Sequence, residues 1–365
     1  MSTHTPHPDL SPPAANVGVI GWLRSNLFSS WLNSGFTLLA LYLLYLTVPP
    51  LIEWAFIKAD WVGDSRDACT SGGACWVFVS VRFDQFMYGF YPSEEYWRIN
   101  IAFGLLVLLA IPLFIERFHH KGMLAAFILF IYPVIAYQLF SGGSFGLELV
   151  ETSRWGGLTL TLILSGVGIV ASLPIGIVLA LGRRSKMPIV KSVSVVFIEF
   201  WRGVPLITVL FMASVMLPLF LPEGSHFDKL LRAMIGIVLF QSAYMAEVVR
   251  GGLAAIPKGQ YEAAEALGLS YWKCMGLIIL PQALKLVIPG IVNTFIALFK
   301  DTTLVLIIGL FDLLAMIQTA FADPKWLGFS IEGYVFAALI FWIFCFSMSR
   351  YSQALERKLH TGHAR

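Results

Sequence analysis

Long apolar runs separated by short polar segments dominate this chain. Eight runs are each near the ~20 residues that a helix needs to cross a bilayer, and they cover residues 34–57, 99–115, 123–140, 158–182, 203–221, 232–250, 279–299 and 333–349. The whole sequence is 58% hydrophobic and 13% charged, whereas soluble domains are about 25% charged. The pattern predicts an all-α integral membrane protein with about eight transmembrane helices.

A ninth apolar segment, residues 304–320, carries Asp312 as its only charge. If it crossed the bilayer, the last helix would end outside, and basic residues prefer the cytoplasm. The residues concerned are Arg350, Arg357, Lys358 and Arg365. We therefore expect a re-entrant or flat element. Such backbone is tolerated at membrane depth only where it is buried in protein or lines a water-filled path, so it indicates a translocation route.

Charge in the loops predicts the orientation of the chain. Residues 117–122 and 183–191 are basic and should be cytoplasmic, whereas residues 58–98 and 141–157 lean acidic and should be external. Both termini are then cytoplasmic. Residues 1–32 are polar and then amphipathic, with apolar side chains that predict an interfacial helix, namely Trp22, Leu23, Leu27, Phe28 and Trp31.

A polar, alanine-rich stretch, residues 257–281, lies between two apolar runs. Pro257 suits the start of a helix, and Gly268 allows the left-handed turn that ends one. Small residues should form a face that a partner can approach closely, provided by Tyr261, Ala263, Ala264, Ala266 and Leu267. A second amphipathic piece follows at 271–275, and Pro281 marks the entry to the next span. This predicts a helix-turn-helix on the cytoplasmic face. The alternative is an amphipathic loop without a partner.

Four motifs in this order resemble those of polar amino-acid ABC importer permeases. Residues 262–281 resemble the EAA loop of the membrane subunits of ABC importers through Glu262-Ala263-Ala264, Gly268, Ile278 and Leu280-Pro281. The others are EFWRGVPL at 199–206, AYMAEVVRGG at 243–252 and KDTTL at 300–304. Three extra N-terminal spans, with Cys69 and Cys75 before Trp76, look most like the M-type permease subunit of general L-amino acid ABC transporters.

The resemblance implies a type I ABC importer transmembrane fold in the C-terminal part. The expected organisation is a cytoplasmic N-terminal segment (1–32), a three-helix extension with external loop 58–98 (33–150), a transmembrane domain with coupling loop 257–281 (151–356) and a basic tail (357–365). The implied function is import of L-amino acids from the periplasm across a bacterial inner membrane. The ATPase-coupling residues would be Tyr261, Glu262, Ala263, Ala264, Glu265, Leu267, Gly268 and Pro281.

The sequence contains no G-x-x-x-x-G-K-[ST] phosphate loop, so this chain is not expected to hold ATP by that device. We expect a non-catalytic subunit without a cofactor of its own, with ATP and Mg²⁺ on two copies of a cytoplasmic ATPase. A second homologous permease and a periplasmic amino-acid-binding protein would complete the assembly, surrounded by lipid and without nucleic acid. The pairs His119-His120 and His360…His363 lack metal-site spacing, so no metal is expected.

Charged and polar groups in spans cost energy and need a reason. Candidates for the translocation path are Gln241, Ser242, Tyr244, Asn293, Lys300, Asp301, Thr302 and Thr303. Lys300 and Asp301 could meet the two ends of a zwitterion, or could form an ion pair that orders a turn. The uncharged groups could instead join helices. Glu199 and Arg202, like Glu247 and Arg250, are three apart and could pair on a helix or contact a partner.

Two helices contain residues that break the backbone ladder, Pro174 with Gly176 and Pro289 with Gly290. They are candidate hinges or fixed kinks. Cys69 and Cys75 lie in an external loop, where an oxidising compartment allows a disulfide, with two free thiols as the alternative. Cys274 and Cys345 are expected to pack.

Two other function classes remain open on the residues alone. An ion-coupled secondary amino-acid transporter would also show broken, charged spans, but it would usually contain an internal repeat, which residues 1–150 and 151–365 do not share. A membrane scaffold would not need the segment at 304–320.

Overall fold

The computed structural model describes residues 18–115, 117–220, 222 and 227–359. The chain divides into two compact units, Met1–Val77 and Phe78–Arg365. Unit 2 runs without a break through residue 150, where the sequence suggests the end of an extension. His360, His363 and most of the basic tail lie outside the described residues.

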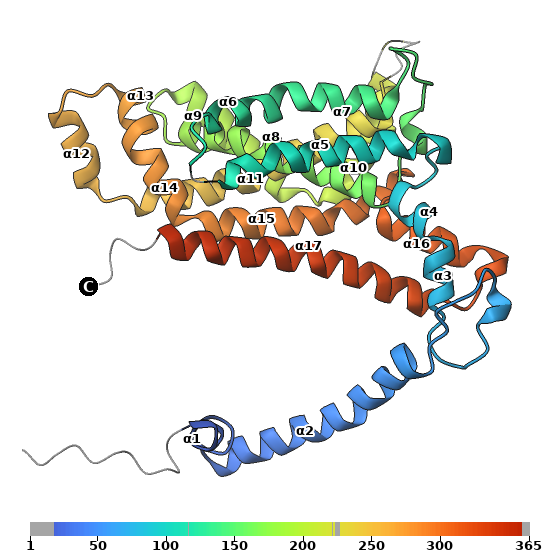
Figure 1. The fold of residues 1–365 in the computed structure, drawn as a ribbon. Coiled ribbons are helices and arrows are strands. Elements are labelled where there is room, and N and C mark those ends of the chain that lie inside the picture. The colour runs from blue at the N-terminus through green and yellow to red at the C-terminus, as the bar shows by residue number, and fades with distance from the viewer. Residues whose placement is uncertain (1–17, 116, 221, 223–226, 360–365) are drawn as a thin grey trace, which may run out of the picture. The chain divides into compact units, whose positions relative to one another are not determined.

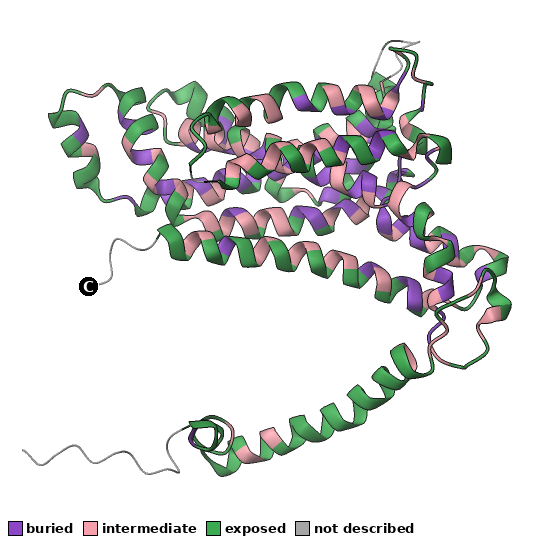
Figure 2. Cartoon of the chain, in the orientation of Figure 1, coloured by how far each residue is buried: buried purple, intermediate pink, exposed green. Residues whose placement is uncertain are grey.

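Unit 1 contains α1 (Gly18–Asn26), α2 (Trp31–Ile52) and the π-helical turn η2 (Glu53–Ile57). The predicted interfacial helix is shorter than its apolar pattern, because α2 already begins at Trp31. The Ser30 hydroxyl caps α2 by accepting a hydrogen bond from the Asn33 N–H at 3.2 Å. No residue of α2 is buried (Figure 2), and most residues of this helix are apolar. Such a helix is suited to lipid contact.

The loop after η2 is closed on itself. A disulfide joins Cys69 and Cys75, and the Asp60 N–H donates to the Ala74 carbonyl while the Trp76 N–H donates to the Asp60 carbonyl, both at 2.9 Å. The Trp76 indole N–H donates to the Ala55 carbonyl at 2.7 Å. This small, cross-linked cap follows the first span, and its external location stays a prediction.

Unit 2 is a helical bundle (Figure 1). Its main elements are α3 (Trp76–Val81, at the boundary), α4 (Phe83–Tyr88), α5 (Tyr96–Phe114), α6 (Lys121–Ala126), η5 (Phe127–Ile131), α7 (Tyr132–Ser141), α8 (Gly157–Arg183), α9 (Pro188–Gly203), α10 (Leu206–Phe211), η7 (Met212–Met216), η8 (Leu217–Phe220), α11 (Lys229–Ala255), α12 (Lys258–Ala266), α13 (Tyr271–Cys274), η9 (Met275–Ile279), α14 (Leu280–Leu286), α15 (Ile288–Asp301), η10 (Thr302–Ile308), α16 (Leu313–Ala322) and α17 (Ser330–Leu359).

The all-α membrane fold is confirmed. Among the described residues, seven helices are long and apolar enough to cross a membrane, and the pair α9 and α10–η8, bent by 101°, gives an eighth. The span predicted at 279–299 is shifted to Ile288–Ile308, because the helix breaks at Val287. Pro289 then lies in the first turn of α15, where its missing N–H has no cost.

The segment predicted at 304–320 is not one continuous helix. Residues 302–308 continue α15 as a 3₁₀ helix, and Gly309 turns the chain with φ +72°. The following helix α16 has 10 residues, which span about 15 Å at 1.5 Å per residue, half of a bilayer core. It lies beside α4, at the end of unit 2 opposite α12 (Figure 1).

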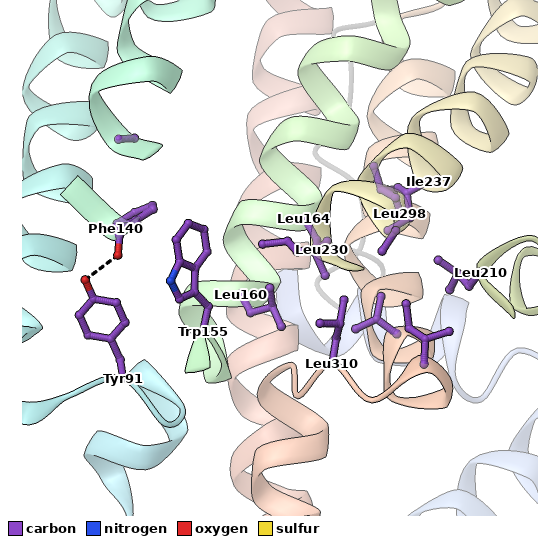
Figure 3. Packing of buried hydrophobic residues seen from close by; sticks show 14 of the residues in the cluster. Tyr91, Phe140, Trp155, Leu160, Leu164, Leu210, Leu230, Ile237, Leu298 and Leu310 are labelled. Atoms are coloured by element: carbon purple, nitrogen blue, oxygen red, sulfur yellow. Dashed lines mark hydrogen bonds between the residues drawn. The ribbon is translucent and has the colours of Figure 1, made fainter. Parts of the chain in front are cut away.

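Two buried cores hold unit 2 together. One lies where the extension meets the remaining bundle: Tyr91, Phe140 and Trp155 pack in one cluster with Leu160 and Leu164 of α8 (Figure 3). The Tyr91 hydroxyl donates to the Phe140 carbonyl at 2.8 Å. The second core surrounds α11 near α12 and contains Met245, Ala246, Val249, Leu253 and Ala264.

Helices α8 and α11 form the centre of the bundle, and glycines of α8 allow them to approach closely. A Cβ on Gly176 would lie 2.7 Å from the Met245 side chain of α11, and one on Gly168 would lie 3.2 Å from Ile237 of α11 and 2.7 Å from Leu298 of α15. The helix α8 continues through Pro174. The structure therefore places small-residue packing at Gly176, and the helix is not interrupted there.

Candidate functional site

The predicted helix-turn-helix is present as α12 and α13, and it projects from one end of unit 2 (Figure 1). Gly268 ends α12 with φ +70°. Its N–H donates to the Glu265 carbonyl at 2.9 Å, while the Leu269 N–H donates to the Ala264 carbonyl at 3.1 Å. This is the Schellman pattern, in which a glycine pairs the last helical carbonyls.

The faces of α12 differ from the predicted small-residue surface. Ala264 is fully buried and Tyr261 is half-buried, and both belong to the second core. Lys258, Gly259 and Gln260 are exposed in the first turn of α12, and the rest of its exposed side, up to the turn, is formed by Glu262, Ala263, Glu265, Ala266 and Leu267. Sequence spacing could not separate the two faces, because alanine suits packing on either side. We call the exposed residues from Glu262 to Leu267 the α12 outer face.

Pro281 lies in the first turn of α14, after the π-helical turn η9. Trp272 is 73% exposed, so the second helix of the motif also leaves a large aromatic side chain uncovered.

Five charged residues meet at the same end of unit 2, where α8, α9 and α11 come together. The Glu247 carboxylate contacts Nη1 of Arg183 at 2.9 Å, Nη2 of Arg250 at 2.9 Å and Nη1 of Arg202 at 3.8 Å. Arg183 Nη1 also contacts Glu199 at 2.8 Å. We call Arg183, Glu199, Arg202, Glu247 and Arg250 the ionic cluster. With three cations and two anions, it carries one excess positive charge.

The predicted pairs are only partly present. Glu247 and Arg250 pair as their spacing indicates, whereas Glu199 pairs with Arg183 of α8 and Arg202 turns to Glu247 and to the Tyr244 ring, 5.9 Å from its centroid. A helical i,i+3 spacing permits a pair, but here the neighbouring helices offer better partners. Arg183 was noted in the sequence only as a basic loop residue, and no local pattern connects it to Glu199 or Glu247.

The eight candidate path residues differ in exposure and in their hydrogen bonds. Gln241 and Ser242 are buried, and they donate to the carbonyls of Thr294 and Val238 at 2.8 and 2.6 Å. Thr302 is fully buried and donates to the Phe299 carbonyl, and Thr303 donates to the Lys300 carbonyl, both at 2.9 Å. All four satisfy backbone carbonyls, but only Gln241 joins two helices, α11 and α15; the other three bond within their own helical segment.

The remaining candidates are Tyr244, Asn293, Lys300 and Asp301. Tyr244 is exposed, and its ring contacts the guanidinium of Arg202, a member of the ionic cluster. Lys300 and Asn293 are exposed on α15, and Asp301 is half-buried at its end. Their part in a path stays a prediction.

Asp312 is a buried carboxylate that enters the sequence analysis only as the single charge of residues 304–320. It is fully buried and caps α16, because its Oδ1 accepts the Ala315 N–H at 3.0 Å. Its Oδ2 has no hydrogen-bond partner among the described residues. Burial raises the pKa of the Asp312 carboxyl to about 6, although backbone N–H groups of Ala315 and Leu314 oppose the shift. The described part of the chain shows no group of three residues suited to a metal ion.

These features define a multi-pass membrane protein that displays a short helical loop at one end of unit 2. Residues 172–361 match the family described as the binding-protein-dependent transport system inner membrane component. The chain belongs to this family.

Relatives match over nearly the full length. The chain is 64% identical over 341 residues to the inner membrane amino-acid ABC transporter permease protein YhdY of Escherichia coli (strain K12), covering 93% of each chain. It is 42% identical over 420 residues to the glutamate/glutamine/aspartate/asparagine transport system permease protein BztC of Rhodobacter capsulatus, covering 96% of each.

A shorter relative matches only part of the chain. The probable amino-acid ABC transporter permease protein YckA of Bacillus subtilis is 33% identical over 202 residues, which are 55% of this chain and 87% of that protein. Because the family match begins at residue 172, the added length lies on the N-terminal side, as the sequence indicates.

Proposed function

We propose that this chain is the membrane-spanning permease subunit of an ATP-driven importer for L-amino acids. Membership of the family and the two full-length amino-acid permease relatives support the class of transport. The observation that carries the proposal is the α12 outer face, a projecting helix with small and acidic side chains that no other part of the described chain covers.

The motor belongs to other subunits in this proposal. Two copies of a cytoplasmic ATPase bind and hydrolyse ATP with Mg²⁺, and one copy docks on the α12 outer face. A second, homologous permease provides the other docking loop, and a periplasmic binding protein delivers the amino acid. Both termini of this chain are cytoplasmic, at the same membrane face as α12.

The ionic cluster is suited to closing the α12 end of the helical bundle reversibly. Its contacts are between side chains of three helices, with Glu247 only 17% exposed and Glu199 54% exposed. Such pairs can exchange partners when helices tilt, whereas a packed apolar contact must separate as a whole. The cluster would hold the bundle closed at this end until the motor moves α12.

The test is amino-acid uptake by the complete complex in proteoliposomes supplied with ATP and binding protein. Ala263→Arg should abolish docking, because it adds a long cation to the exposed middle of α12 without entering the core. We expect uptake to fall more than tenfold and the ATPase to be lost on purification of the permease.

A matched variant makes the result specific. Met187→Arg adds the same side chain at a 61% exposed position in the basic loop before α9, and it should leave uptake near the wild-type rate. Equal uptake by both variants would contradict docking at α12. ATP-independent uptake by the permease alone would favour an ion-coupled transporter instead.

A further inference from the structure

The loop end contains a three-group contact that joins α8, α11 and α12. Nη1 of Arg184, at the C-terminus of α8, donates to the Leu253 carbonyl of α11 at 2.9 Å and to the Tyr261 hydroxyl of α12 at 3.0 Å. The Tyr261 hydroxyl in turn donates to the Leu253 carbonyl at 3.4 Å. The Arg184 guanidinium also stands over the Tyr261 ring, 5.5 Å from its centroid.

The Leu253 carbonyl needs these donors because residue 257, four positions later, cannot donate to it. In a continuing helix, the N–H of residue 257 would donate to it. Residue 257 is proline, which has no N–H, and α11 ends at Ala255. A carbonyl at the end of a helix must then be paired by a side chain or by water. Arg184 and Tyr261 fill this place together.

The contact adds a polar connection to apolar packing, since Ala180 of α8 and Ala264 of α12 belong to one core. A cavity of about 390 Å³ separates α12 from the bundle here, and its lining includes Arg184, Leu253, Lys258, Tyr261 and Glu265. Beside this cavity, the hydrogen bond and the ring contact of Arg184 with Tyr261 connect α8 directly to α12. Ala264 anchors α12 elsewhere, in the second core.

We propose that Arg184 is a positioning residue that transmits movement of α12 to α8 and so couples ATP hydrolysis to transport. The inference rests on the proposed function, because it assumes that a motor moves α12. A planar guanidinium suits the role, since it donates to two acceptors and stacks on an aromatic ring at the same time. A lysine has the charge but lacks the flat, forked geometry.

The experiment measures amino acid imported per ATP hydrolysed by the complete complex in proteoliposomes. Arg184→Ala should still assemble and hydrolyse ATP, because the α12 outer face is unchanged, but import per ATP should fall about fivefold, the effect of one or two net hydrogen bonds. Arg184→Lys should recover part of this ratio. A role in assembly alone would lower the yield of complex and leave the ratio unchanged.

Tyr261→Phe tests the same contact from the other side. It keeps the ring and removes the hydroxyl, so import per ATP should fall about twofold. In the double variant the two losses should not multiply, because both changes break one contact. If Arg184→Ala does not assemble, the ratios of Arg184→Lys and Tyr261→Phe decide the result.

Lys186→Ala is the control, since Lys186 is an exposed cation in the same loop, and its ratio should equal that of the wild type. The proposal would be overturned if Arg184→Ala imported as much amino acid per ATP as the wild type. If Arg184→Ala does not assemble, a wild-type ratio in both Arg184→Lys and Tyr261→Phe would overturn it. If Ala263→Arg still abolishes docking and uptake in that case, only this inference fails. If neither Arg184→Ala nor Ala263→Arg affects import, the proposed function fails as well.

Discussion

The two ends of unit 2 are built by different kinds of contact. The loop end, which carries α12 and the ionic cluster, is joined by side-chain charges and hydrogen bonds. The far end, which carries α4 and α16, also has an ion pair, between Arg82 and Asp323, but it adds direct backbone contacts of glycine. The Gly157 N–H donates to the Phe311 carbonyl at 2.9 Å, and a Cβ on Gly157 would lie 2.3 Å from the Phe86 carbonyl oxygen.

The difference indicates which end can move. Backbone elements in direct contact have one arrangement, and separating them loses packing and hydrogen bonds together. Long charged side chains can follow a moving helix or change partners at small cost, because exposed pairs contribute little. We therefore expect the far end to act as a fixed support and the loop end to rearrange.

The largest effect is expected at the far end. Gly157→Ala forces a side chain into the Phe86 carbonyl at a backbone φ of +62°, and we expect the free energy of unfolding to fall by about 3–5 kcal/mol. Thermal unfolding of the purified chain in detergent measures this.

Gly166→Ala is the control on the same helix. A Cβ there meets no atom within 4 Å, so stability should be equal or slightly higher. Equal unfolding temperatures for the two variants would contradict a backbone-locked far end.

At the loop end, Glu247→Gln removes the anion that three arginines share. Because the Glu247 side chain is 17% exposed, we expect a loss of about 2 kcal/mol, less than the 3–5 kcal/mol for a fully buried pair. Glu199→Gln should cost under about 1 kcal/mol, since its side chain is 54% exposed and has one partner. Chemical unfolding of both variants in detergent would decide; equal losses would show that the cluster is not centred on Glu247.

A smaller effect should appear as a pH dependence at the far end. The folded pKa of Asp312 is about 6, above the ordinary value near 4, so the folded chain binds an extra proton between these values. Stability then falls as pH rises through this window and levels off above it. Between pH 5 and pH 7 the free energy of unfolding should fall by about 1 kcal/mol more in the wild type than in Asp312→Asn, which retains the cap. Parallel pH profiles would show that Asp312 is not buried.

Much of the fold follows from the sequence, because a bilayer requires long apolar helices, and basic loops predict their orientation. The motif at 257–281 was also predictable, since Pro257 and Gly268 bound a helix by local chemistry. The contacts between helices were not. Arg183, Arg184 and Leu253 are joined to residues 16 to 77 positions away, and no local spacing records which helix stands beside which. Gln241 and Ser242 show the same limit, because polar residues on a span can face a path or a neighbouring carbonyl.

The central claim is that a cytoplasmic ATPase subunit binds the α12 outer face. Leu267→Cys tests it in a chain with Cys345→Ser, because Leu267 is 76% exposed, Cys274 is buried and Cys69 and Cys75 are joined. A membrane-impermeant maleimide should label this cysteine only from the cytoplasmic side, and the bound ATPase should protect it. Labelling from the external side, or labelling at the same rate with and without the ATPase, would contradict the claim.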